Sequence, residues 1–84
     1  MGKREICRTY TIDDAPPQTV FLHHDELVWW DGEACLRRLG VYDYIREPYG
    51  AFVRVEEMGR HHMVAVADDE GSEDWIDPRG WEVM

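Results

Sequence analysis

The sequence predicts an α+β fold in a single small domain, and three observations support this prediction. Residues 51–56 and 62–67 are two strand-like runs joined through Gly59, which predicts a β-hairpin. Residues 31–39 carry the start and stop signals of one short helix. At 84 residues the chain has room for one hydrophobic core, so residues 1–84 are expected to form one domain.

The N-terminal part is expected to contain strands separated by a proline loop. A strand is predicted over residues 5–12, where apolar and polar side chains alternate among β-branched and aromatic types. It ends at residues 13–17, because the two consecutive prolines there lack amide donors. A second strand is predicted at 19–22. The apolar run 27–30 is equally compatible with a strand and a helix.

The predicted helix begins at Asp31, whose carboxylate can accept hydrogen bonds from the free amides of a first turn. Glu33 lies near the positive end of the helix dipole, and Arg37 and Arg38 fall in the last turn, where cations are favourable. Gly40 can adopt the left-handed conformation that ends a helix. A helix this short is stable only when it packs on a sheet, which is why the prediction is α+β.

The C-terminal half is predicted to be a β-meander. Residues 51–56 alternate cleanly, and the hairpin that they form with 62–67 is followed by an acidic turn at 68–72. Short strands are expected at 74–77 and 81–84, on either side of a turn that contains proline and glycine. Together with the N-terminal strands this gives an antiparallel sheet of four to six short strands and one helix.

The two cysteines, Cys7 and Cys35, are expected to be free, buried thiols. A disulfide-rich secreted scaffold of this size usually carries four or more cysteines. The polar first residues and the absence of a long apolar run favour a cytoplasmic location.

No metal or other cofactor is expected. The adjacent pairs His23-His24 and His61-His62 lack the spacing of zinc ligands. A calcium loop with Gly71 at its sixth position would need Val66 as its first ligand, and valine has no oxygen on its side chain.

The most informative feature is the concentration of negative charge in residues 56–84. The chain has a net charge of −9, and this last third contains nine acidic residues against two arginines. A field of this strength keeps a protein soluble and attracts basic partners. The candidate partner-binding residues are six carboxylates and two neighbouring aromatics: Asp68, Asp69, Glu70, Glu73, Asp74, Asp77, Trp75 and Trp81.

Catalysis and direct binding of nucleic acid are disfavoured. The chain contains no nucleophile elbow, phosphate-binding glycine loop or zinc-protease motif, so no enzymatic activity is expected. Phosphate binding requires lysine and arginine, which are scattered here. A small basic face of Arg4, Arg8, Arg37 and Arg38 is the remaining alternative for a nucleic-acid contact.

The sequence therefore predicts a non-enzymatic acidic binding protein, an inhibitor or adaptor that occupies the basic, nucleic-acid-binding groove of a partner protein. In size and charge alone, the chain is similar to phage anti-restriction and anti-CRISPR proteins and to bacterial nuclease immunity proteins. These proteins share no motif, so the similarity assigns no residues. The alternative is a structural protein that self-associates through Trp29, Trp30 and the edges of the sheet.

Overall fold

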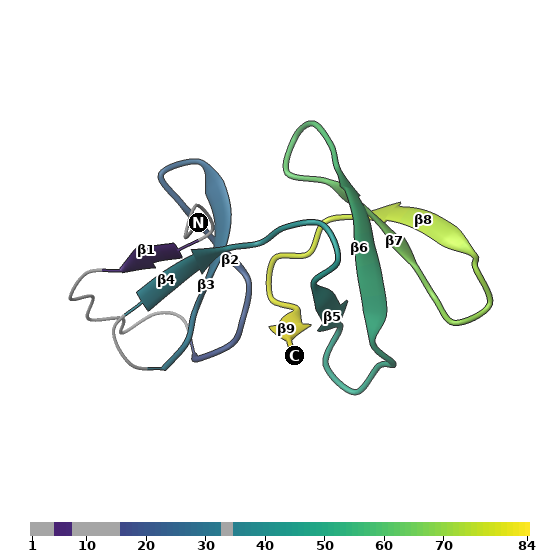
Figure 1. Ribbon diagram of the computed structural model, residues 1–84, viewed down its shortest axis with the longest axis horizontal. Coiled ribbons are helices and arrows are strands. Elements are labelled where there is room, and N and C mark those ends of the chain that lie inside the picture. Colours follow the sequence, from purple (N-terminus) through teal and green to yellow (C-terminus); the bar gives the residue numbers. More distant parts are fainter. Residues whose placement is uncertain (1–4, 8–15, 33–34) are drawn as a thin grey trace.

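The chain folds into two antiparallel β-sheets, which the computed structural model describes for residues 5–7, 16–32 and 35–84 (Figure 1). The first sheet has the strand order β1-β4-β3-β2, and the second has the order β8-β7-β6-β5-β9. The strands are β1 Glu5–Cys7, β2 Phe21–His23, β3 Glu26–Trp30, β4 Cys35–Arg38, β5 Tyr44–Arg46, β6 Val53–Met58, β7 Val64–Ala67, β8 Glu73–Ile76 and β9 Glu82–Val83. These residues contain no helix, so the α+β prediction is wrong and the described fold is all-β.

The predicted helix at 31–39 is the main error. Of its described residues, Asp31 and Gly32 follow β3, and Cys35–Arg38 form the strand β4, whereas Glu33 and Ala34 lie outside the described residues. Asp31 does accept a backbone hydrogen bond, but the donor is the amide of Cys35 across the turn, at 3.4 Å. β4 pairs with β3 on one side and with β1 on the other, so the sheet satisfies its backbone groups more completely than a marginal two-turn helix would.

The two arginines that resembled helix-terminating cations are cross-strand contacts. Arg37 lies opposite Trp29 in the register of β3 and β4, and its guanidinium carbon lies 5.7 Å from the centroid of that ring. Arg38 Nε donates to both carboxylate oxygens of Glu26, at 3.2 and 3.1 Å. Side chains on neighbouring strands of a sheet make such contacts as readily as side chains on one helix.

The ambiguous run 27–30 is resolved as the strand β3. Its neighbours Leu27 and Val28 point to opposite faces of the first sheet, and both are buried. A strand that is buried on both faces reads as a continuous apolar run rather than an alternating one, which is why the sequence pattern did not separate strand from helix.

The predicted C-terminal meander is confirmed for β6, β7 and β8 only. β6 and β7 form the expected hairpin, with a register shift between Val55 and Glu57, and β8 pairs with β7. The last strand, β9, pairs with β5 rather than with β8, so that Ile45 lies opposite Val83. β5 was not predicted. It lies at the start of the meander, and β9 returns to it at the end of the chain.

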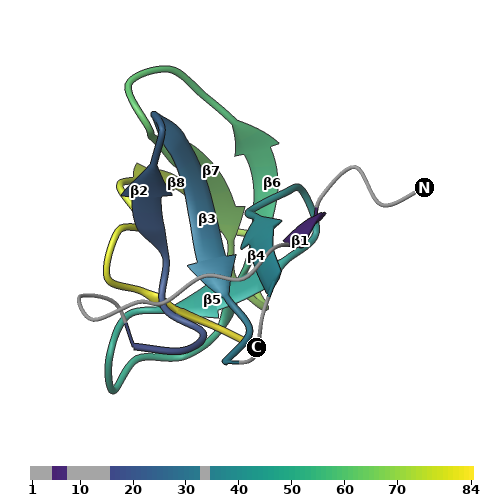
Figure 2. The same cartoon turned by 90° about the vertical axis from the view of Figure 1, so that its left-hand side faces the viewer.

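Backbone hydrogen bonds connect the two sheets. The amide of Gln18 donates to the carbonyl of Trp30 at 2.7 Å, and its carbonyl accepts from the amide of Val83 at 2.8 Å. Thr19 forms an isolated bridge with Glu82. The segment that precedes β2 therefore lies between the first sheet and β9. Figure 2 shows the first sheet from its outer side, with the second sheet behind it.

One hydrophobic cluster contains residues of both sheets. Its buried members are Val20, Leu27, Leu39, Ile45, Val55, Val64, Val66 and Val83. Leu27 belongs to the first sheet and Ile45 to the second, so the two sheets share this core. Ile45 is completely inaccessible to solvent and lies between β6 and β9.

The prediction of free thiols is also wrong, because Cys35 is disulfide-bonded. The sequence holds one other cysteine, Cys7, which lies opposite Cys35 in the pairing of β1 with β4. The prediction of free thiols rested on the small number of cysteines. That number does not indicate that the register of β1 and β4 places Cys7 opposite Cys35.

Some predictions fall outside the described residues. Only Glu5–Cys7 of the strand predicted at 5–12 is described, and it is a strand as expected. The first three residues of the loop at 13–17 lie outside, as do Arg4 and Arg8 of the alternative basic face.

A tyrosine occupies a turn position that normally selects glycine. In the turn at residues 47–50, the amide of Gly50 donates to the carbonyl of Glu47 at 2.8 Å, Pro48 is second and Tyr49 is third with φ of 68°. This arrangement is that of a type II turn, whose third residue needs positive φ. The Tyr49 side chain is fully exposed, at 103% of its reference area.

We expect Tyr49→Gly to raise the free energy of unfolding by about 1 kcal/mol, because glycine adopts positive φ without the steric penalty of a Cβ. Urea denaturation would measure the change. Tyr49→Ala is the control, since alanine keeps the Cβ and should give no such gain. An equal gain in both variants would show that the backbone conformation is not the cause.

Candidate partner-binding surface

The acidic turn at residues 68–72 is built around Asp68. Asp68 Oδ1 accepts the amides of Glu70 and Ser72, both at 2.9 Å, and the Asp68 amide donates to the carbonyl of Ser72 at 3.1 Å. Aspartate side chains commonly organise turns in this way. Asp68 is therefore a structural residue first, although it keeps its negative charge on the surface.

Asp77 is neutralised locally. Arg79 Nε donates to both of its carboxylate oxygens, at 3.0 and 3.1 Å, and the Arg79 amide donates to Oδ1 at 3.1 Å. These hydrogen bonds, the side-chain ones first, hold the pKa of Asp77 below its ordinary value, and the same contact raises the pKa of Arg79. Asp77 thus contributes little net charge to a partner surface.

Three of the other predicted carboxylates form neither an ion pair nor a side-chain hydrogen bond within the described residues. The arginines that form ion pairs in the described residues are Arg37 with Asp31, Arg38 with Glu26, Arg46 with Glu82, Arg54 with Glu56 and Arg79 with Asp77. In that same part of the chain, Asp69, Glu70 and Glu73 form no ion pair and are exposed, although Arg54 lines the same hollow as Asp69. The local excess of charge predicted from sequence is thus not cancelled by pairing.

The two predicted aromatic residues have different environments. Trp75 is 48% exposed on the edge strand β8, and its ring covers Gly59, where an added Cβ would collide with it. Trp81 is partly buried and packs against the hydrophobic core. Trp75 therefore suits a surface contact, whereas Trp81 is a core residue with one accessible side.

A groove adjoins the acidic turn at the end of the second sheet. It has a volume of about 440 Å³ and is lined by Glu47, Val53, Val66, Asp68, Ser72, Glu73, Asp74, Ile76 and Trp81. Asp74 lies opposite Val66 in the pairing of β7 with β8, so both side chains lie on the inner face of the sheet. Asp74 Oδ1 accepts the amide of Trp75 at 3.0 Å, which fixes the orientation of its carboxylate.

The groove combines predicted residues with residues that sequence analysis missed. Asp68, Glu73, Asp74 and Trp81 were predicted, whereas Glu47 was not. Glu47 comes from the turn between β5 and β6, which lies at the same end of the sheet as the β7–β8 turn because β6 pairs with both β5 and β7. The sequence of residues 47–50 is typical of a turn. No local pattern in it indicates that this turn lies beside the acidic turn at 68–72.

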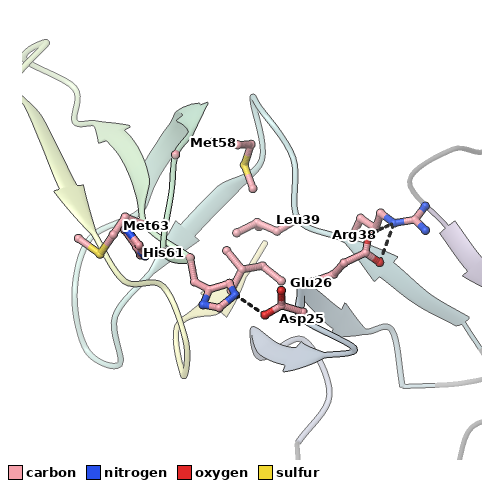
Figure 3. A pocket seen from close by; sticks show the side chains of 10 residues that line it. Asp25, Glu26, Arg38, Leu39, Met58, His61 and Met63 are labelled. Atoms are coloured by element: carbon pink, nitrogen blue, oxygen red, sulfur yellow. Dashed lines mark hydrogen bonds and ion pairs between the residues drawn. The ribbon is translucent and has the colours of Figure 1, made fainter.

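A second hollow lies between the two sheets, at the tips of their hairpins (Figure 3). His62 Nε2 lies 2.9 Å from Asp25 Oδ1, and this contact connects the β6–β7 turn to the β2–β3 turn. Met58, Leu27 and Leu39 supply apolar lining. No group of three or more histidine, cysteine or acidic side chains in the described part of the chain could hold a metal ion.

Most of the residues proposed for self-association already make contacts within the fold. Trp29 and Trp30 are partly buried, and Trp29 packs against the core and under Arg37. The outer strands are β1 and β2 in the first sheet and β8 and β9 in the second. β8 carries Glu73 and Asp74, and charges on an edge strand oppose pairing with the same edge of a second copy.

Comparison with known proteins adds no assignment: no protein family, curated protein or solved structure matches the chain. The described residues include no helix with the length and hydrophobicity that crossing a membrane requires.

Proposed function

We propose that this chain is a non-enzymatic acidic binding protein, whose unpaired carboxylates at the β7–β8 end contact a basic, nucleic-acid-binding surface of a partner protein. The observation that supports this proposal is the charge imbalance that survives folding. Asp69, Glu70 and Glu73 form no ion pair among the described residues, while most of the arginines there are paired with other carboxylates.

The geometry of the acidic end is compatible with mimicry of a nucleic acid. Asp69 and Glu70 lie in the turn between β7 and β8, and Glu73 is the first residue of β8, so the three carboxylates are close in the chain at one end of the sheet. A nucleic-acid strand likewise carries closely spaced charges, one per roughly 3.4 Å of axis. A folded ridge of carboxylates can therefore present charges to a groove that binds phosphates. Complementary charge gives fast association that weakens as salt is added.

Neutralising the free carboxylates should weaken partner binding on the order of 100-fold, since each close charge contact in water is worth ~1 kcal/mol. The variant is Asp69→Asn, Glu70→Gln and Glu73→Gln. Asp68 is left unchanged because its carboxylate holds the turn. The partner is first captured from the source cells with the tagged chain and identified, and its affinity is then measured with purified proteins across a salt series.

The matched control changes the net charge equally at other sites: Glu26→Gln, Glu57→Gln and Glu82→Gln. Exposed ion pairs contribute little to stability, so the control should fold and should bind nearly as the wild type does. Duplex DNA should also compete with the chain for the partner. Equal losses in both variants, or binding that persists at 1 M salt, would contradict the proposal and favour an apolar self-association surface instead.

A cytoplasmic location remains part of the proposal, and the disulfide at Cys35 is the observation that opposes it. Disulfides are rare in the cytosol and persist in oxidising compartments. Alkylation of free thiols in intact cells tests the location. A chain recovered without the label has its cysteines in a disulfide, which would place the protein outside the cytosol.

A further inference from the structure

We propose that the groove at the end of the second sheet binds an arginine side chain of the partner protein. This inference rests on the proposed function, because it specifies which group of a basic partner enters the surface. The groove is formed by the turn at residues 47–50, the turn at 68–72, the strand β8 and Trp81.

The floor of the groove is apolar. It consists of Val53, Val66, Ile76 and Trp81, all of which belong to the hydrophobic core or pack against it. Val66 is buried, but the other three keep an accessible side. The inner face of the sheet is thus uncovered at this end, and core side chains form the wall of an open hollow. An apolar stem that lies on this wall would remove it from water.

The rim of the groove is negative. Glu47, Glu73 and Asp74 border it together with Asp68, and no cationic side chain is among the described residues that line it. The hydrogen bonds that hold two of these carboxylates use one oxygen each: Asp68 Oδ1 accepts backbone amides of its turn, and Asp74 Oδ1 accepts the amide of Trp75. Their Oδ2 atoms remain available for a donor, in orientations that the backbone has already fixed.

An arginine side chain matches this arrangement. Its three methylene groups fit an apolar wall, and its planar guanidinium presents five donors to carboxylates on different sides of the groove. The guanidinium is also weakly hydrated and stacks favourably on an indole ring such as that of Trp81. A lysine ammonium is a compact, strongly hydrated charge, so it gains less from the same apolar wall. The volume of about 440 Å³ admits the side chain with part of its backbone.

The test uses a small probe in place of the unidentified partner. N-acetyl-arginine amide is titrated into the isotope-labelled chain, and nuclear magnetic resonance follows the indole resonance of Trp81 and the amides of Val66 and Ile76. We expect saturable shifts in the millimolar range, as suits so small a ligand. The citrulline analogue has the same shape without the charge, and it should bind at least tenfold more weakly, as should the lysine analogue.

Two variants locate the site. Asp74→Asn removes a rim charge and should weaken the arginine probe several-fold, whereas Glu57→Gln removes an exposed charge outside the groove and should leave it unchanged. The inference is wrong if Trp81 shows no saturable shift, if citrulline or lysine binds as well as arginine, or if the two variants lose affinity equally.

The outcome for the groove is separable from the outcome for the proposed function. A partner whose capture depends on Asp69, Glu70 and Glu73, together with no response of Trp81 to arginine, would remove only the groove assignment. A groove that binds arginine, together with no charge-dependent partner, would remove only the proposed function.

Discussion

Ile45→Ala is expected to lower the free energy of unfolding by about 2–5 kcal/mol and to leave much of the protein unfolded at room temperature. Deletion of buried methyl groups costs the lost transfer free energy and leaves a cavity. Ile45 is fully buried and lies opposite Val53 on one neighbouring strand and Val83 on the other. Small domains have only a few kcal/mol of stability, so this one change removes a large part of it.

Urea denaturation followed by circular dichroism would measure the effect. Ile45→Val keeps most of the volume and should cost about 0.5–1.5 kcal/mol. Val41→Ala is the exposed control, because Val41 is 38% accessible, and it should change stability by no more than ~0.5 kcal/mol. Equal losses in the free energy of unfolding for Val41→Ala and Ile45→Ala would show that Ile45 is not packed in the core of the second sheet.

Removal of the disulfide is expected to have a comparable effect. Closing a loop of roughly 28 residues restricts the unfolded chain by about 3–4 kcal/mol in the chain-entropy description. Cys35→Ser should therefore lower the midpoint of thermal unfolding on the order of 15 °C for a domain of this size. The loss should fall on the first sheet, where the cysteines lie opposite each other on β1 and β4.

The same measurement contains its own control. A reductant should lower the unfolding temperature of the wild type to that of Cys35→Ser and should leave the variant itself unchanged. Two results together would contradict the prediction. The thiols of the native wild-type chain would react with an alkylating reagent, and its stability would not depend on reductant.

The β6, β7 and β8 part of the second sheet was predictable because its signals are local. The alternation of residues 51–56 predicts β6, and the turns at Gly59 and at 78–80 each predict that a strand follows. β6, β7 and β8 pair in chain order. A β-meander of this kind needs only short-range information. The closing of the sheet by β9 on β5 connects residues almost 40 positions apart, for example Ile45 and Val83, and no local pattern announces it.

One strand of the first sheet, β4, was predicted as a helix for a physical reason. Asp31, Arg37, Arg38 and Gly40 have the chemistry that caps a short helix, and the same chemistry serves a hairpin turn, a cross-strand ion pair and a contact with an indole ring. Intrinsic preferences over eight residues are worth too little to decide between these outcomes. Cys35–Arg38 form a strand and not a helix because they pair with β1 on one side and with β3 on the other.

The sequence by itself determined the chemistry of the acidic end, namely which side chains carry charge and that few cations accompany them. Only the tertiary structure decided which of those charges are free. Asp68 is engaged by its turn and Asp77 by Arg79, whereas Glu47, distant in sequence, joins Glu73 and Asp74 around an apolar floor. The reason is that charge is a property of each residue, while pairing, burial and a groove depend on which distant strands become neighbours.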